Sequence, residues 1–259
     1  MKPSVRIILA AAAVAACLFI WLLSDRLAAE ARREVTLNRV EAVVADSLER
    51  KFITPEDVKD WMDDYGTYMG LRLDSVDLYK VETLIDRKSA VRKSQAWLTG
   101  DGTLHISVTQ REPVVRFQSR DGGGFYADRD GFLFPLQNRH TARVPIVDGD
   151  LPLHLEKGFK GEPETEAGKA WVSSVLSLVR YLESKKEWSD LVGQVTVLKG
   201  GSLVIIPRDG NERFLFGTPT DIEAKFDRIR KYYEGVAPLE QGYRTVDVRF
   251  AHQIVCKKH

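Results

Sequence analysis

Histidines are the side chains best suited to transfer protons or bind metal ions near neutral pH, and this chain has five. They are His105, His140, His154, His252 and His259. No two of them lie at a metal-ligand spacing, and no His-Glu-x-x-His motif occurs. His105 alternates with apolar positions, which predicts a solvent-facing side chain on a strand. The histidines therefore predict neither a metal site nor an acid–base pair.

Two glycine-containing stretches resemble ligand loops but lack the partners that such loops need. Gly122–Gly124 is not followed by the helix and lysine of a phosphate-binding loop. Asp128, Asp130 and Gly131 resemble the start of a calcium loop, yet its third acidic ligand and distal glutamate are missing. Both stretches predict turns. Since no Gly-x-Ser-x-Gly or Ser-x-x-Lys motif is present either, we expect no catalytic residue, cofactor or metal, and a protein that is not an enzyme.

The C-terminal segment has the pattern most able to carry function. From Tyr243 to Phe250, polar and apolar residues alternate as they do in a long β-strand. At a sheet edge, such a strand offers unpaired backbone groups to a partner strand. Inside a sheet, the same strand is purely structural. The spacing favours neither position over the other.

The composition excludes several classes of protein. Lys and Arg number 38 against 37 Asp and Glu, so the net charge of +1 gives no electrostatic footprint for nucleic acid. The two cysteines, Cys17 and Cys256, are too few for a disulfide scaffold or a cysteine zinc site. The length of 259 residues fits one or two globular domains.

An uncharged segment near the N-terminus predicts a membrane anchor. Residues 7–24 carry no charge, and as a helix they span about 27 Å, close to the thickness of a hydrocarbon core. Lys2 and Arg6 precede the segment without an acid, so the positive-inside rule keeps residues 1–6 in the cytoplasm. Residues 25–35 predict a juxtamembrane helix or linker. We expect a single-pass protein of the inner (cytoplasmic) membrane with its bulk in the periplasm.

Three alternatives compete with a retained anchor. A cleavable signal peptide has a possible cleavage site at Ala29–Ala31, although the apolar run is longer than the usual ~7–15 residues. A lipoprotein signal at Cys17 is disfavoured because more apolar sequence follows it. A buried core helix is disfavoured by the terminal position and the flanking charges. The retained transmembrane helix is the prediction that we carry forward.

Residues 36–113 predict an α+β domain. Thr54–Asp57 has the features of a helix start: a threonine cap, a proline at the first position and two acids. Two amphipathic helices are expected between a first short strand and two strands joined by a turn at Gly100–Gly102. The predicted order is therefore β-α-α-β-β. Trp97 is expected to be a core residue of this domain.

Residues 114–259 predict a mixed or antiparallel β-sheet domain with two helices. The Glu112-Pro113 pair marks its start, because proline interrupts a central strand. Phe117 is expected in the core, and residues 137–165 are expected to form a loop. Apolar residues from Trp171 to Leu182 predict the first helix, and those from Ile222 to Tyr233 predict the second. Three strands are expected between these helices, at residues 193–198, 202–206 and 212–216.

Several stretches resemble the FtsQ/DivIB family of bacterial cell-division proteins, and the C-terminal one is most similar to the family's Bacteroidetes branch. They are Phe52–Val58, Leu73–Leu78, Leu104–Val114, Phe125–Phe132 and Val246–Lys257. The resemblance spans the chain, and it implies one POTRA domain followed by a C-terminal β domain. POTRA-like strings alone are weak evidence, because outer-membrane assembly proteins also carry them. A POTRA-containing export or outer-membrane assembly component is therefore the alternative.

The resemblance implies a non-enzymatic divisome scaffold at the septum. Its expected partners are FtsB-like and FtsL-like division proteins, with other divisome members as further candidates, and neither nucleic acid nor a small-molecule substrate. In the family, the last part of the β domain binds FtsB, partly by strand addition. Carried over to this chain, the expected contact residues are Tyr243, Arg244, Val246, Asp247, Arg249 and Phe250.

Overall fold

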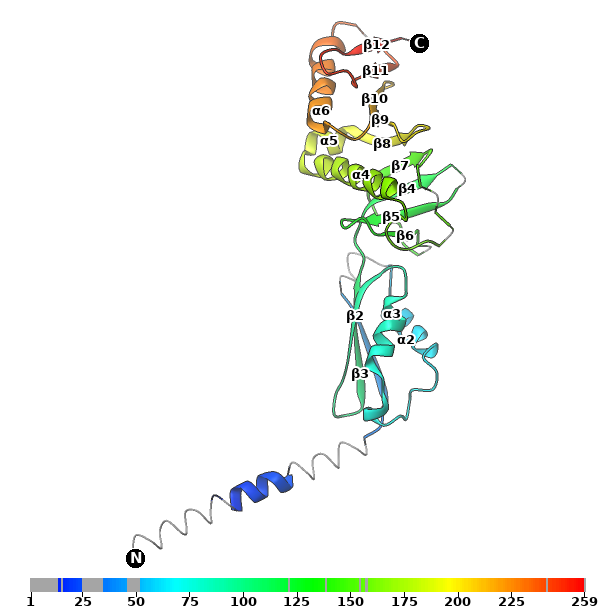
Figure 1. Cartoon of the computed structure of the whole chain (residues 1–259). Coiled ribbons are helices and arrows are strands. Elements are labelled where there is room, and N and C mark those ends of the chain that lie inside the picture. Colours follow the sequence, from blue (N-terminus) through cyan, green and yellow to red (C-terminus); the bar gives the residue numbers. More distant parts are fainter. Residues whose placement is uncertain are drawn as a thin grey trace, which may run out of the picture. The chain divides into compact units, whose positions relative to one another are not determined.

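The computed structural model describes two folded units and a short N-terminal helix (Figure 1). The described residues are 14, 16–24, 35–45, 52–120, 122–137, 139–153, 155–156, 158–240 and 242–258. By internal contacts, the chain divides into Met1–Gln110 and Arg111–His259. The sequence prediction places the boundary between its two folded domains after residue 113.

The predictions of a transmembrane helix over residues 7–24 and of a single-pass inner-membrane location are wrong for the part of the chain that the structure describes. No helix in that part is long and apolar enough to cross a membrane. Residues 14 and 16–24 are helical, whereas residues 7–13 and 15 of the expected span lie outside the described residues. Residues 1–6 and the expected juxtamembrane segment up to residue 34 lie outside the described residues.

The first unit has the predicted β-α-α-β-β order. Its elements are β1 (Arg39–Val44), α2 (Pro55–Asp63), the 3₁₀ turn η1 (Leu73–Ser75), α3 (Leu78–Asp86), β2 (Val91–Leu98) and β3 (Thr103–Gln110). The three strands form one sheet in the order β1-β3-β2, with β1 parallel and β2 antiparallel to β3. The parallel β1–β3 pair is possible because α2, α3 and β2 all lie in the connection between these two strands.

Local chemistry explains where the first helix of this unit starts. The Thr54 side chain accepts a hydrogen bond from Asp57 N–H, and the Asp57 carboxylate accepts one from Thr54 N–H, which forms a capping box. Pro55 then occupies the first helical position. Val58 and Met62 are buried on one face of α2, where they contribute to the apolar core.

Trp97 is not the core residue that the sequence predicts. Its side chain is 45% exposed and stacks on His105, with ring centroids 5.2 Å apart and planes 11° apart. The two residues are register partners on β2 and β3. The helices cover the opposite face of the sheet, where Leu104, Ile106 and Val108 are buried. His105 is on the uncovered face as predicted, although the stacking leaves it half-buried.

The second unit contains one nine-stranded sheet, in the order β12-β11-β10-β9-β8-β7-β4-β5-β6. It is mixed: three neighbouring pairs are parallel (β4–β7, β7–β8 and β10–β11) and five are antiparallel. The strands are β4 (Pro113–Ser119), β5 (Gly124–Asp128), β6 (Leu133–Pro135), β7 (Ile146–Gly149), β8 (Val192–Val197), β9 (Leu203–Pro207), β10 (Arg213–Gly217), β11 (Thr245–Asp247) and β12 (Val255–Lys257).

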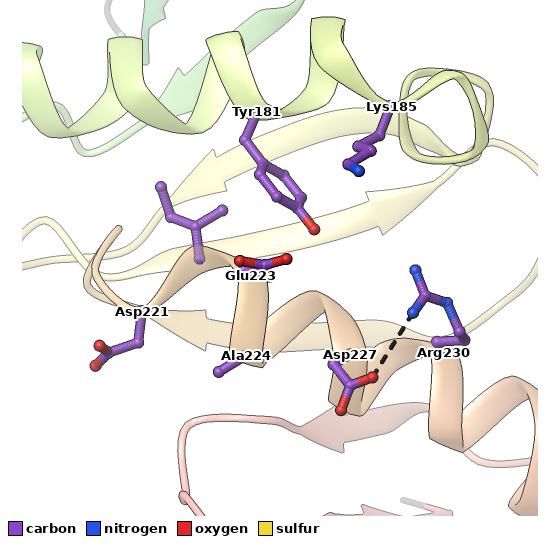
Figure 2. Close-up of a pocket in the computed structure, with 8 residues that line it drawn as sticks. Tyr181, Lys185, Asp221, Glu223, Ala224, Asp227 and Arg230 are labelled. Atoms are coloured by element: carbon purple, nitrogen blue, oxygen red, sulfur yellow. Dashed lines mark ion pairs between the residues drawn. The ribbon is translucent and has the colours of Figure 1, made fainter.

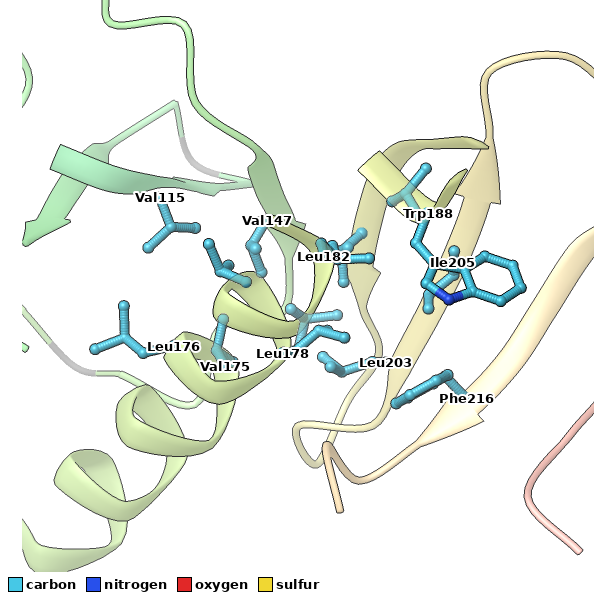
Figure 3. Packing of buried hydrophobic residues seen from close by; sticks show 14 of the residues in the cluster. Val115, Val147, Val175, Leu176, Leu178, Leu182, Trp188, Leu203, Ile205 and Phe216 are labelled. Carbon is cyan, nitrogen blue, oxygen red and sulfur yellow. The ribbon is translucent and has the colours of Figure 1, made fainter. Parts of the chain in front are cut away.

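The helices of this unit pack on the sheet and complete one apolar core. They are α4 (Glu166–Ser184), α5 (Lys186–Leu191) and α6 (Ile222–Lys231), which continues into the π-helical turn η2 (Tyr232–Val236). Figure 3 shows Val175, Leu178 and Leu182 of α4 beside buried side chains of several strands. Around α6, the Phe226 ring lies 4.8 Å from that of Trp188 and 5.4 Å from that of Phe216. Phe117 is fully buried, as predicted.

Three expectations for this unit are corrected. The expected loop 137–165 contains β7, which lies in the middle of the sheet between β4 and β8. A third helix, α5, follows α4 directly. Of the long strand expected from Tyr243 to Phe250, only β11 (Thr245–Asp247) forms, because the chain turns after Asp247 and pairs back as β12 from Val255.

Candidate partner-binding edge

The two edges of the nine-stranded sheet differ in what covers them. At one edge, Leu133 of β6 exchanges two backbone hydrogen bonds with Gly161, of 2.8 and 2.9 Å. At the other edge is β12, and no further strand pairs with its outer side among the residues that the structure describes. Since an uncovered edge is a template for a partner strand, β12 is the candidate site.

The hydrogen bonds of the neighbouring strand show which groups of β12 face outward. Val248 N–H donates to Leu215 O of β10, so the backbone groups of Val246 and Val248 face β10 and those of Thr245 and Asp247 face β12. Thr245 and Asp247 pair with Lys257 and Val255. The backbone N–H and C=O of Cys256, between those two, therefore point to the open side.

Cys256 supplies this edge with a protonated thiol. Burial raises the pKa of the thiol, and the nearby Glu240 carboxylate adds to the effect. Because the thiolate is the reactive form, the raised pKa leaves Cys256 without the activation of a catalytic cysteine. What Cys256 offers at this edge is its outward backbone N–H and C=O.

Side chains hold the connection between β11 and β12 in place. The Arg249 guanidinium donates to both oxygens of Asp247, at 2.9 and 2.6 Å, and Arg249 N–H donates to the same carboxylate at 3.1 Å. Burial alone would raise the pKa of Asp247, but the hydrogen bonds from Arg249 outweigh it and the pKa is lowered. From α6, Arg228 donates to Val248 O and Ala251 O, at 2.8 and 3.3 Å. Phe250, 45% exposed, is thereby held at the surface.

A second cluster holds the C-terminal end of the edge strand. Lys258 contacts one oxygen of Glu240 at 2.5 Å, and the Tyr243 hydroxyl donates to the other at 2.5 Å. The Lys258 bond, followed by that from Tyr243, lowers the pKa of Glu240. The bond to Glu240 raises the pKa of Tyr243 to about 12. One ion pair, Asp247–Arg249, therefore holds the connection that leads into β12, and another, Glu240–Lys258, holds the residue directly after it.

The six contact residues expected from the sequence occupy different environments. Val246 is fully buried in the core, and Asp247 is 7% exposed and bound to Arg249. Tyr243 is half-buried, whereas Arg244, Arg249 and Phe250 are exposed. These residues lie on β11 and its flanks, and the outermost strand is β12 instead. Sequence reasoning missed Val255–Lys257 as the edge, because no local pattern reveals which strand is outermost.

A polar pocket of about 650 Å³ lies between α4 and α6 (Figure 2). Tyr181 and Lys185 line it from α4 and its C-terminal end, and acids of α6 line it from the other side. Arg230 pairs with Asp227 at 3.7 Å and with Glu187 at 2.6 Å. The described part of the chain holds no group of three residues able to bind a metal ion. The pocket therefore offers paired surface charges and no arrangement of reactive groups.

Two family models match this chain. The model of the FtsQ/DivIB C-terminal related domain matches residues 112–257, which is more than half of the chain. The chain belongs to the FtsQ/DivIB family. A POTRA-like domain model matches residues 36–109, and a search of curated proteins finds no match. The resemblance noted from the sequence is confirmed, and both domains are of non-catalytic scaffold types in a division-related family.

Proposed function

We propose that this protein is a cell-division scaffold that binds a partner by strand addition to β12. FtsB-like and FtsL-like proteins are the partners that its family membership suggests. The observation that carries the proposal is the difference between the sheet edges: β6 is bridged by Gly161, whereas β12 is the uncovered outer strand of the described sheet. Ion pairs hold the ends of β12, so little ordering is needed on binding.

Strand addition alone gives only part of the affinity, because β12 has three residues. Each hydrogen bond to the outward groups contributes about 0.5–1.5 kcal/mol net. Covering the ring of Phe250 adds up to about 1.5–3 kcal/mol, in proportion to the area that is buried. Phe250 is therefore the expected side-chain anchor beside the backbone contacts. Exposed Arg244 and Lys257 add positive charge that favours an acidic partner segment.

The backbone contact is tested by two substitutions at one position. Cys256→Pro removes the outward N–H, which the fold does not use, and Cys256→Ser keeps it. With the full chain and the FtsB-like and FtsL-like proteins of the same organism, we expect the proline variant, which loses one hydrogen bond, to bind about three- to tenfold more weakly. The serine variant should bind within about twofold of the unchanged chain.

The measurement is isothermal titration calorimetry, accompanied by the melting temperature of each variant. Equal binding of Cys256→Pro and Cys256→Ser, with both folded, would contradict strand addition at β12. Absence of binding by the unchanged chain to both partners would contradict the scaffold proposal itself.

A further inference from the structure

The three-stranded sheet of the first unit also has two edges, and one of them is closed by side chains. At β2, Ser94 N–H donates to the Asp86 carboxylate at 2.7 Å, and Ala96 N–H donates to the Glu82 carboxylate at 2.8 Å. Both acids come from α3. These carboxylates occupy the outward N–H groups, so β2 cannot accept a partner strand without losing them.

The opposite edge, β1, shows outward backbone groups without such partners. Arg39 N–H and Ala45 N–H donate to Gly102 O and Val108 O, at 3.4 and 2.9 Å, so the odd-numbered residues face β3. The N–H and C=O groups of the even-numbered residues, 40, 42 and 44, therefore point away from the sheet. No described residue donates to them or accepts from them. This uncovered edge is twice as long as β12.

The chain itself already uses the upstream part of the same edge. Leu37 N–H donates to Leu71 O at 2.8 Å, and Gly70 N–H donates to Leu37 O at 2.7 Å, in an antiparallel arrangement. Asn38 N–H and Arg39 N–H both donate to Gly102 O, so the alternation shifts by one residue at this point. Leu37 therefore faces the outer side, although the odd-numbered residues from Arg39 onward face β3. The edge at Leu37 is thus covered by the antiparallel segment at Gly70 and Leu71, whereas the part of the edge formed by β1 has no such cover among the described residues.

The uncovered face beside β1 indicates what kind of segment would fit. The register places Glu41, His105 and Trp97 in one row across the sheet and Val43, Ser107 and Gln95 in the next. His105 lies 3.5 Å from the Glu41 carboxylate and stacks on Trp97. Val43, 61% exposed, is the apolar member beside the edge.

A strand added to β1 would place alternate side chains next to these rows. An apolar residue would cover Val43, a basic residue would extend the Glu41 row, and an acid would lie beside Arg39. Arg39 is exposed, and its contact with Glu41 is long, at 3.5 Å. Its guanidinium can therefore also pair with an acid of the partner. Antiparallel addition gives the closely spaced hydrogen-bond pairs that the outward groups at 40, 42 and 44 can make.

We propose that β1 is a second strand-addition site, for an extended antiparallel segment of another protein that carries apolar, basic and acidic residues at alternate positions. The order along the partner, from its N-terminus, is apolar, basic, acidic. The site lies in a different unit from β12 and does not depend on what binds there. The protein would then hold two extended segments on two separate sheets.

The test uses a designed peptide, acetyl-Thr-Val-Thr-Lys-Thr-Glu-Thr-amide, with the full chain. Bound antiparallel, it places valine beside Val43, lysine beside Glu41 and glutamate beside Arg39. In hydrogen exchange followed by NMR, the amides of Val40, Ala42 and Val44 should become protected. Those of Glu41 and Val43 should not change, because they already face β3. The control peptide has proline in place of the threonine opposite Ala42 and should not bind.

Two variants at one position separate the site from general adhesion. Ala42→Pro removes an outward N–H and should weaken peptide binding about tenfold, whereas Ala42→Ser should bind within about twofold of the unchanged chain. Where Ala42→Pro fails to fold, Val43→Lys tests the same site. It replaces the apolar side chain beside the peptide's valine with a lysine, close to the peptide's own lysine. Missing protection at about 1 mM peptide, protection at other strands, or unchanged binding by a folded Ala42→Pro or Val43→Lys variant would each overturn the proposal.

Discussion

At the two edges of the nine-stranded sheet, the loops beside the outermost strand are fixed in different ways. Next to β6, the backbone of Gly161 bonds to Leu133, and the chain closes its own edge. Next to β12, side chains hold the turns: Asp247 with Arg249, and Glu240 with Lys258. A side-chain network can fix a strand without using the strand's outward backbone groups. That difference leaves the outer backbone groups of β12 available for the proposed strand addition, while the β12 end is still held in place.

The largest expected effect is at the closed end, where Arg111 and Asp128 form a buried ion pair. The two side chains contact each other at 2.7 Å and are 14% and 5% exposed, and Asp128 also accepts from the N–H groups of Asp130 and Phe132. Asp128→Ala leaves the guanidinium buried without its counter-charge, which should cost about 3–5 kcal/mol of unfolding free energy.

Denaturant-dependent hydrogen exchange of the β4 and β5 amides measures this loss in the second unit. Glu183→Ala is the matched control, because Glu183 makes an exposed pair with Arg129 and its loss should cost about 0–1 kcal/mol. A similar, small effect of both variants would show that the closed end does not depend on the buried pair.

A smaller loss is expected at the open end from Asp247→Asn. The substitution weakens the bidentate bond to Arg249, and since that guanidinium is half-exposed, the cost should be about 1–2 kcal/mol. Binding to β12 should weaken as well, because the turn before the strand loses its fixed shape. The control is Asp227→Asn, which removes an exposed pair with Lys231 on α6.

The dependence of the unfolding free energy on pH in the acid range tests the same Asp247–Arg249 pair. The folded-state pKa of Asp247 is below the ordinary value of 3.8, so its contribution is complete above pH 3.8. That contribution disappears as the pH falls through the lower, folded-state pKa. Unfolding free energies of the unchanged chain and of Asp247→Asn should therefore converge below pH 3.8. A constant difference over the whole acid range would contradict the ionised role of Asp247.

Gly161→Ala should have a still smaller effect, at the residue that closes the β6 edge. Gly161 has a φ of +137°, which a residue with a side chain rarely adopts, and the nearest atom to an added Cβ is 3.7 Å away. Backbone strain alone should therefore cost about 1 kcal/mol. Thermal unfolding measures it, with Gly158→Ala, at a φ of +84° and without a backbone bond to β6, as the comparison. A loss equal to that of Gly158→Ala would show that the backbone bonds between Gly161 and Leu133 add nothing to the effect.

The predictable parts of the fold were those with local signals. The three strands β8, β9 and β10 lie within about two residues of their predicted bounds, because alternation and glycine turns define each of them. The strand β7 was missed, since Ile146 and Val147 give too short an apolar run after Pro145. Its place between β4 and β8 depends on parallel partners far away in the sequence.

The candidate site was only partly predictable for the same reason. Alternation from Tyr243 to Phe250 indicated extended structure, which the chain adopts only over Thr245–Asp247, because it turns at the Asp247–Arg249 pair and returns as β12. Which of these is outermost depends on strand order, and strand order has no local signal. The exposed Phe250 beside a buried Val248 is likewise a result of that turn.

Phe250→Lys should have the smallest effect on stability, and it separates the binding role of the open end from its structural role. The ring is 45% exposed, so the unfolding free energy should change by only about 0.5 kcal/mol or less. The melting temperature should therefore change little. Binding of the FtsB-like partner should nevertheless weaken about tenfold or more, since the apolar anchor is lost. The matched control is Tyr79→Lys, an exposed aromatic residue of the other unit. A large fall in melting temperature would show that the ring supports the fold, and equal binding by both variants would remove Phe250 from the interface.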